Sequence, residues 1–466
     1  MYKPLNKYLI LGFFIVLASV YKAQFARFNR ITVDDGLTQN SIISMIQDKK
    51  GFIWLGTYNG LNKYDGVKIT NYNANIDDST AIFNGAIRCL YADDDDNLWG
   101  GTAGGVFKMN LRNGKITNFK YDTLNKNCLS NEIVNTIAEF EPGKLYIGTN
   151  DGLNILDKKS GKFTVFRKMG QNSIPFLSDR IKHMVKDTRG HIWFSHLNAG
   201  ITEFDPATGK CKYYSSNEEH NKINSNSVRA LYLDKKGYLW ISCWNAGANV
   251  IDTKTGKIYS SQDSSHAIKM LKHAALISAF HEDEKGNIWW ATAEHGLVRI
   301  SSDYNNITFF ENNKDDSETI SDNTVFTIMQ DRSGLLWAGT WQGGVNTLNL
   351  RTLHFGYFKH ESTKPNSLSE NSVQCFGKKS GTEVYVGHSG GVDIFNLEKK
   401  TFSKFPIDES NPNSLRKNSI VLEVYTDPKD SSVWFSTSGG YPYRYFPKNK
   451  KYANYINRGD TNSFGH

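Results

Sequence analysis

Short stretches of alternating apolar and polar residues fill most of the chain, and Gly, Asn or Asp bounds each of them. In the stretch from Gln47 to Asp65, a turn at Asp48–Gly51 precedes an apolar segment centred on Trp54, and a second turn at Asn59-Gly60 precedes another short segment. A period of two predicts β-strands, and Gly-containing turns join such strands into hairpins. Because a single hairpin is only marginally stable in water, this one must pack against further strands.

The same pattern returns along the chain at a nearly constant interval. The aromatic residue at the centre of the second strand recurs at spacings of 45 to 49 residues, in nine copies. The copies are Trp54, Trp99, Tyr146, Trp193, Trp240, Trp289, Trp337, Tyr385 and Trp434. A period of about 40 to 50 residues with four short strands predicts the blades of a β-propeller. We expect these aromatic residues to be structural, since each buries a large area between neighbouring blades.

The first repeat shows how each blade is built. We expect strands at 41–47, 52–57, 61–64 and 68–72, with the first strand nearest the propeller axis. The turn between the second and third strands then shares one face with the long connection 73–84 to the next repeat. Binding residues usually lie on long connections, so this face is the candidate ligand face.

Nine repeats exceed the four to eight blades with which a propeller typically closes. The segment Phe25–Ile31 resembles a leading fourth strand that pairs into the last blade of a ring. We therefore predict an all-β fold, with one complete seven-bladed ring over residues 24–350 and the first blades of a second ring over 351–466. The phrase Asn462-Ser463-Phe464 resembles the lead-in to earlier blades, which indicates a truncated fragment of a longer protein.

The N-terminal residues 1–23 differ from the repeats. Lys3 and Lys7 precede an apolar run, Tyr8–Val20, that is too short for an ordinary membrane span, and Ala23-Gln24 is a suitable cleavage point. This pattern predicts a cleaved export signal, with an uncleaved anchor as the alternative. The five Cys are scattered over different repeats, which argues against a disulfide framework. The net charge of +8 is too small and too dispersed to indicate nucleic-acid binding.

Two sets of residues are candidates for ligand binding. Alignment of the first strands puts a cation at one equivalent position in the second, fourth and fifth repeats, namely Arg88, Lys182 and Arg229. Three cations facing a common space would recognise an acidic saccharide. The turns between second and third strands offer rings for stacking on sugars and polar groups for hydroxyls. These turn residues are Asn198, Trp244, Asn245, Glu294, His295, Trp341 and Gln342. The alternatives are an ordinary polar channel lining for the cations, and packing on neighbouring loops or on a second propeller for the turns.

The sequence contains few patterns that indicate catalysis or metal binding. The run Asp93–Asp96 lies in a turn, where Asp is favoured for backbone reasons, and lacks the Gly and distal Glu of a calcium loop. No nucleophile elbow or phosphate loop is present in the sequence, and no pair of carboxylates stands out. We therefore predict no catalytic residue, no metal and no cofactor.

The repeat resembles the two-component regulator propeller repeat. The matching residues in the first copy are Gly36-Leu37, Asn40-Ser41-Ile42, Asp48, Gly51, Trp54, Gly56-Thr57, Gly60-Leu61 and Tyr64-Asp65. The resemblance covers residues 25–466 and implies the periplasmic sensor region of hybrid two-component histidine kinases of Bacteroidetes, which sense polysaccharide breakdown products. It further implies two propellers, a homodimer in the full-length protein, and membrane, kinase and DNA-binding segments that this sequence lacks.

The sequence therefore predicts a periplasmic sensor that binds an oligosaccharide and is not itself an enzyme. Two other functions remain open at this point. A secreted lyase or glycoside hydrolase would need an acid/base cluster on the ligand face, and a protein-binding scaffold would show a broad apolar patch.

Overall fold

The computed structural model describes residues 26–170, 172–260, 276–350 and 358–455. The predicted export signal and the phrase at 462–464 lie outside these residues. The chain divides into two compact units, residues 1–353 and 354–466. No helix in the described part of the chain is long and apolar enough to cross a membrane.

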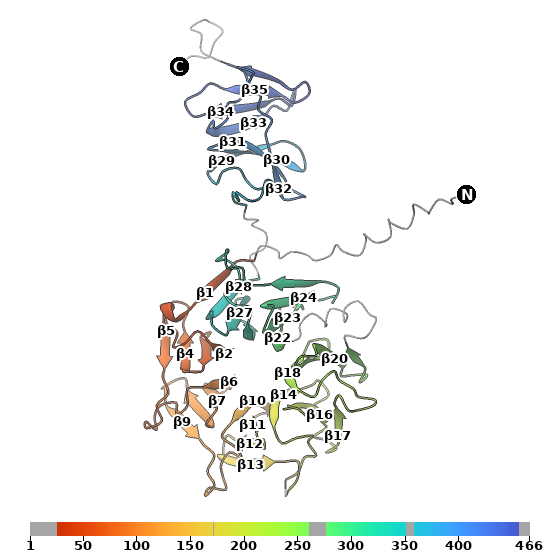
Figure 1. Ribbon diagram of the computed structural model, residues 1–466. Coiled ribbons are helices and arrows are strands. Elements are labelled where there is room, and N and C mark those ends of the chain that lie inside the picture. Colours follow the sequence, from red (N-terminus) through yellow and green to blue (C-terminus); the bar gives the residue numbers. More distant parts are fainter. Residues whose placement is uncertain (1–25, 171, 261–275, 351–357, 456–466) are drawn as a thin grey trace, which may run out of the picture. The chain divides into compact units, whose positions relative to one another are not determined.

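The described residues of the first unit form seven four-stranded antiparallel sheets (Figure 1). In six of the sheets the four strands pair in chain order, and in the seventh the outer strand comes from the start of the chain. The first three sheets contain β2 (Ile42–Gln47), β3 (Ile53–Thr57), β4 (Gly60–Tyr64), β5 (Ile69–Tyr72), β6 (Ile87–Ala92), β7 (Asn97–Thr102), β8 (Val106–Asn110), β9 (Ile116–Phe119), β10 (Val134–Glu141), β11 (Lys144–Thr149), β12 (Gly152–Asp157) and β13 (Lys162–Phe166). The next two contain β14 (Ile181–Lys186), β15 (Ile192–His196), β16 (Gly200–Phe204), β17 (Cys211–Tyr214), β18 (Val228–Leu233), β19 (Tyr238–Cys243), β20 (Ala248–Asp252) and β21 (Ile258–Ser260). The last two contain β22 (Ile277–Glu282), β23 (Ile288–Thr292), β24 (Leu297–Ile300), β25 (Ile307–Phe310), β26 (Val325–Gln330), β27 (Leu335–Thr340), β28 (Val345–Asn349) and β1 (Phe28–Ile31).

The seven sheets surround a common centre, and their inner strands are β2, β6, β10, β14, β18, β22 and β26 (Figure 1). These inner strands contact one another in chain order, and β26 of the last sheet contacts β2 of the first. The last sheet takes its outer strand from the start of the chain, because β1 pairs antiparallel with β28. The pairing predicted for the leading strand is confirmed, and the described strand runs from Phe28 to Ile31. A short 3-10 helix, η1 (Val33–Asp35), follows β1 and leads toward β2.

The second unit contains two four-stranded sheets among its described residues. Their strands are β29 (Val373–Lys378), β30 (Glu383–His388), β31 (Gly391–Asn396), β32 (Thr401–Lys404), β33 (Val421–Thr426), β34 (Val433–Thr437), β35 (Tyr443–Phe446) and β36 (Lys451–Asn454). The inner strands β29 and β33 contact each other, so the two sheets pack as neighbouring blades do.

The repeated Trp is buried between sheets and is also hydrogen-bonded. Trp54 Nε1 donates to Asp48 Oδ2 at 2.8 Å, and Asp48 also accepts from the backbone N–H of Phe52. The same Trp–Asp bond, six residues apart, occurs at 2.8 to 2.9 Å in five further sheets of the first unit. In the remaining sheet Tyr146 donates to Glu141 instead. The Asp of the turn thus satisfies the one polar atom of a buried indole, which fixes the turn against the strand.

The Gly of the repeated Gly-Thr pair lies where two sheets approach closely. A Cβ atom added at Gly56 would come within 2.8 Å of Ile87 on the inner strand of the next sheet. Gly148 and Gly339 have the same relation to Ile181 and Ile42. A larger side chain would therefore push neighbouring blades apart, because interiors are close-packed.

Candidate functional site

Each inner strand of the first unit carries a β-bulge near its beginning. In β6, for example, the pairing with β7 passes from Ile87–Thr102 to Cys89–Gly101, so Arg88 is the extra residue. A bulge leaves one residue unpaired and changes the direction of its side chain. The residues at the equivalent register shifts, in chain order, are Ile43, Arg88, Asn135, Lys182, Arg229, Ser278 and Phe326. We call these seven residues the bulge ring.

The turn after the second strand of a sheet is held beside the bulge of the same sheet. The backbone N–H of Trp244 donates to the carbonyl of Ser227 at 2.8 Å, two residues before Arg229. Equivalent bonds join Asn150 to Ile133, Leu197 to Arg180, Ala293 to Leu276 and Trp341 to Thr324. In these five sheets the first turn residue therefore lies next to the bulge residue, and the bulge ring lies on the face that carries these turns.

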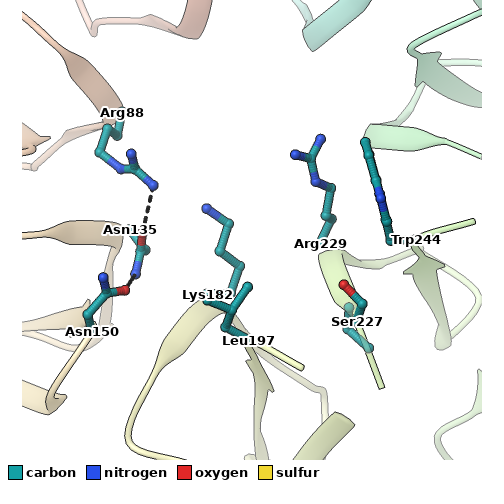
Figure 2. Close-up of a pocket in the computed structure, with 9 residues that line it drawn as sticks. Arg88, Asn135, Asn150, Lys182, Leu197, Ser227, Arg229 and Trp244 are labelled. Atoms are coloured by element: carbon teal, nitrogen blue, oxygen red, sulfur yellow. Dashed lines mark hydrogen bonds between the residues drawn. The ribbon is translucent and has the colours of Figure 1, made fainter. Parts of the chain in front are cut away.

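Four consecutive members of the bulge ring line one pocket of about 340 Å³. They are Arg88, Asn135, Lys182 and Arg229, from β6, β10, β14 and β18. The turn residues Asn150, Leu197 and Trp244 complete the lining together with Ser227 and Val228. Figure 2 shows the three cationic side chains extending from separate strands toward the same space. We call this space the cationic pocket.

Protein contacts order only part of the pocket. Arg88 Nη2 donates to Asn135 Oδ1 at 3.0 Å, and Asn135 Nδ2 donates in turn to Asn150 Oδ1 at 2.9 Å (Figure 2). The Arg88 Nε atom is buried and has no hydrogen-bond partner within the described residues. The guanidinium carbon of Arg229 lies 3.7 Å from the ring centroid of Trp244, a cation–π contact.

The pocket has a surplus of positive charge. Its nine lining residues include three cations and no carboxylate. Burial, and then the charges of Arg88 and Arg229, lower the pKa of Lys182 from 10.5 to about 8. A partly enclosed position also lowers the pKa of Arg229, and the nearby Tyr58 hydroxyl opposes that shift. An anion bound among these side chains would offset their mutual repulsion.

The opposite part of the bulge ring is aromatic. Phe326 meets Trp341, the first turn residue of the same sheet, with ring centroids 5.3 Å apart. Trp341 also contacts Tyr58 of the first sheet at 5.7 Å, and the rings of Tyr58 and Trp341 are 44% and 39% exposed. The ring therefore carries charge on one side and exposed aromatic surface on the other.

The structure brings together four of the ten predicted ligand residues: Arg88, Lys182, Arg229 and Trp244. The pocket lining does not include Asn198, Asn245, Glu294, His295, Trp341 or Gln342. Asn198 and Asn245 are exposed and adopt φ angles of 59° and 57°, a left-handed turn geometry that Asn tolerates well. His295 Nδ1 lies 2.8 Å from Glu311 Oε1, and the backbone N–H of Gln342 donates to Asp322.

Sequence reasoning missed Asn135, Asn150 and Leu197. Asn135 follows Val134 as Arg88 follows Ile87, so the same alignment contains it. Its side chain is uncharged, so the pattern of cations does not include it. Asn150 and Leu197 stand at the first turn position that also holds Trp244.

Two acidic clusters lie among the turns at the other end of the inner strands. Asp93 and Asp95 share the Lys158 ammonium with Glu139, at 3.3, 3.1 and 2.8 Å. Ligand atoms of Asp187, His191 and Glu203 lie within 4.8 Å of one another. The Arg189 guanidinium lies between two of them, 2.5 Å from Asp187 and 2.7 Å from Glu203. Both clusters already have a cation from the chain itself.

Known proteins share this fold and this repeat. Seven similar sheets around one axis define a β-propeller, and solved β-propellers superpose on the chain. Residues 36–59, 222–245 and 319–342 match the two-component regulator propeller family. Three segments of the chain therefore match the two-component regulator propeller repeat that the sequence predicted. Each of the three matched segments includes a bulge residue and the first residue of the adjoining turn.

Relatives with solved structures share the fold. The extracellular domain of a putative hybrid two component system from B. thetaiotaomicron is 22% identical, with a TM-score of 0.72 over 94% of this chain and 55% of that chain. The virginiamycin B lyase from Staphylococcus aureus is 15% identical, with a TM-score of 0.51 over 70% of this chain and 99% of the lyase.

A curated relative matches over a shorter stretch. Histidine kinase P4 of Formosa agariphila is 46% identical over 71 residues, which are 15% of this chain and 5% of the kinase. The chain thus spans about half of the matched extracellular domain and a small part of the kinase.

Proposed function

We propose that the chain is the ligand-sensing propeller of a periplasmic two-component signalling protein, and that it binds an acidic oligosaccharide released from a polysaccharide. The observation that carries this proposal is the convergence of Arg88, Lys182 and Arg229 in one pocket without a carboxylate. Carboxylates and sulfates of acidic sugars form charge-assisted hydrogen bonds with such groups. The site would hold its ligand at the end of the inner strands, where all the blades meet.

Aromatic surface beside the cations favours a saccharide over a small inorganic anion. Trp244 lies against Arg229 within the pocket, and Phe326, Trp341 and Tyr58 occupy the other side of the bulge ring. Sugar rings stack their apolar faces on aromatic side chains while their hydroxyls bond polar groups. Asn150 supplies an amide NH2 group for such bonds, whereas the NH2 group of Asn135 already donates to Asn150 and to the Ile181 carbonyl.

Signalling would follow from differential affinity. A ligand can shift a conformational equilibrium only by as much as it prefers one state over the other. We infer that two copies of the longer protein form a homodimer, and that the bound sugar favours one arrangement of the pair. This chain would act as a receptor and not as an enzyme, because the pocket lining offers no carboxylate for acid/base catalysis.

The test is a thermal-shift screen of the protein against oligouronates and their neutral counterparts. We expect an acidic oligosaccharide to raise the unfolding temperature, since a ligand at 100 times its Kd adds about 2.7 kcal/mol to the stability. The shift should be lost in Arg229→Gln and in Trp244→Ala, and kept in Lys210→Met, which changes an exposed turn lysine. Equal shifts with neutral sugars, or an unchanged shift in Arg229→Gln, would contradict the proposal. Cleavage of the sugar during the assay would point to a lyase or hydrolase instead.

A further inference from the structure

The amine of Lys182 differs from the other two cations of the cationic pocket. Arg88 is bonded to Asn135, and Arg229 stacks on Trp244. Lys182 Nζ has no hydrogen bond or ion pair with the described residues, and Figure 2 shows it between the two guanidinium groups. The bulge in β14 directs this side chain into a pocket large enough for a small ligand.

The surroundings of Lys182 make its amine a nucleophile. Burial and the two neighbouring arginines disfavour the ammonium form, so that its pKa of about 8 leaves roughly a tenth of the amines neutral at pH 7. An ordinary surface lysine has less than about a hundredth of that fraction. A lysine activated by desolvation and by a second cation is the arrangement that forms Schiff bases with carbonyl compounds.

The neighbouring groups also select the carbonyl compound. Arg88 and Arg229 would bind a carboxylate in the same pocket, which would bring a carbonyl on the same molecule close to Lys182 Nζ. Leu197 and Trp244 give the pocket an apolar wall beside the bond formed.

We propose that Lys182 captures its ligand as a reversible imine, and that the ligand is therefore a sugar acid or small organic acid with an aldehyde or ketone group. This inference rests on the proposed anion-binding function of the same pocket. The neutral amine attacks the carbonyl carbon, and its proton passes to the carbonyl oxygen to give a carbinolamine. Loss of that oxygen as water leaves the C=N bond, and addition of water returns the free amine and the carbonyl. No electron donor or acceptor is needed.

Capture would stop at the imine. Further chemistry on the bound molecule needs a base to remove a proton from the carbon next to the imine. The pocket lining has no carboxylate or histidine side chain to do so. The bond would therefore lengthen the residence of a sensed molecule without converting it.

Reductive trapping tests the proposal. The protein is incubated with glyoxylate and cyanoborohydride, and peptide mapping by mass spectrometry locates the carboxymethyl groups that result. We expect labelling of Lys182 at least ten-fold above that of Lys210, which is exposed on the same unit. Acetaldehyde, which has no carboxylate, should lose this preference. Arg88→Gln and Arg229→Gln should reduce the labelling of Lys182.

Two outcomes separate this proposal from the function on which it rests. Equal labelling of Lys182 and Lys210, with a methyl-glycosidic oligouronate still raising the unfolding temperature, would overturn the imine and leave acidic-sugar binding intact. Loss of both signals would overturn both. Lys182→Arg, which keeps the charge, should abolish labelling at this position while retaining part of the thermal shift.

Discussion

Replacing Lys182 by Met is expected to stabilise the protein and to weaken the binding of acidic ligands. At neutral pH the folded chain holds Lys182 charged between Arg88 and Arg229, whereas the unfolded chain holds it in water. Lowering of its pKa from 10.5 to about 8 corresponds to a cost of about 2 kcal/mol once partial solvation is allowed for. The loss of one charge-assisted contact should weaken an anionic ligand about 10- to 100-fold.

The pH dependence of this effect has a definite sign. Below about pH 8 Lys182 is charged in both states, so the cost in the folded state is complete. Between pH 8 and 10.5 the unfolded chain binds more protons than the folded chain, so the stability of the unsubstituted protein rises with pH. The advantage of Lys182→Met should therefore shrink over this range. Over this range Cys89, with a pKa of about 12, stays largely protonated, and His183, with a pKa of about 4, is already neutral.

Urea denaturation followed by tryptophan fluorescence measures this prediction. All of the tryptophans except Trp434 belong to the first unit, so the signal reports mainly on the propeller that holds the pocket. Lys210→Met is the matched control and should change the free energy of unfolding by less than about 0.5 kcal/mol. If the Lys182→Met protein is less stable than the control at pH 7, the charge of Lys182 does not destabilise the folded protein.

Truncation of Phe28 is expected to cost about 3–5 kcal/mol of stability. Phe28 begins β1, the strand that closes the last sheet, and its ring is 6% exposed. It packs edge-to-face on Phe310 with centroids 6.3 Å apart, within a cluster that includes Trp289 and Leu348. Phe28→Ala would leave a cavity where the two ends of the first unit join, and loosening β1 would uncover the edge of β28.

Asn29→Ala is the control for this substitution. Asn29 is the next residue of the same strand and is exposed, so its truncation should change the stability by less than about 0.5 kcal/mol. Urea denaturation of both variants gives the comparison. If Phe28→Ala unfolds at the same urea concentration as Asn29→Ala, β1 does not contribute to closure of the sheet.

The fold could be predicted from the sequence because the same four-strand pattern occurs in nine copies. The spacing of Trp54 and its equivalents gives the length of a blade, and the alternation of apolar and polar residues indicates strands and excludes helices. The leading strand was recognisable because Phe28–Ile31 precedes the first inner strand with no partner of its own. The hydrogen bond from Trp54 to Asp48 was not foreseen, although its constant spacing of six residues is visible in the sequence.

The site could be predicted only in part, because it depends on bulges and on ring closure. Alignment of the inner strands placed Arg88, Lys182 and Arg229 at one position, and the structure puts them in one pocket. A β-bulge does not require a particular residue type. The sequence therefore does not show that these residues are unpaired in their strands. Asn198 and Asn245 were predicted to bind ligand because they are polar residues in turns. Their positions have left-handed backbone angles, which favour Asn for a conformational reason unrelated to binding.

The central claim is that the cationic pocket binds an acidic sugar, and titration calorimetry tests it most directly. The ligand is the methyl glycoside of digalacturonic acid, which has no free carbonyl, with the methyl glycoside of neutral digalactose as its counterpart. Titrations at pH 8.5 in two buffers of different ionisation enthalpy measure proton uptake. We predict binding of the acidic sugar alone, with uptake of about three-quarters of a proton as Lys182 becomes fully charged, and no uptake in Lys182→Met. Equal binding of the neutral sugar, or acidic binding without proton uptake, would contradict the account.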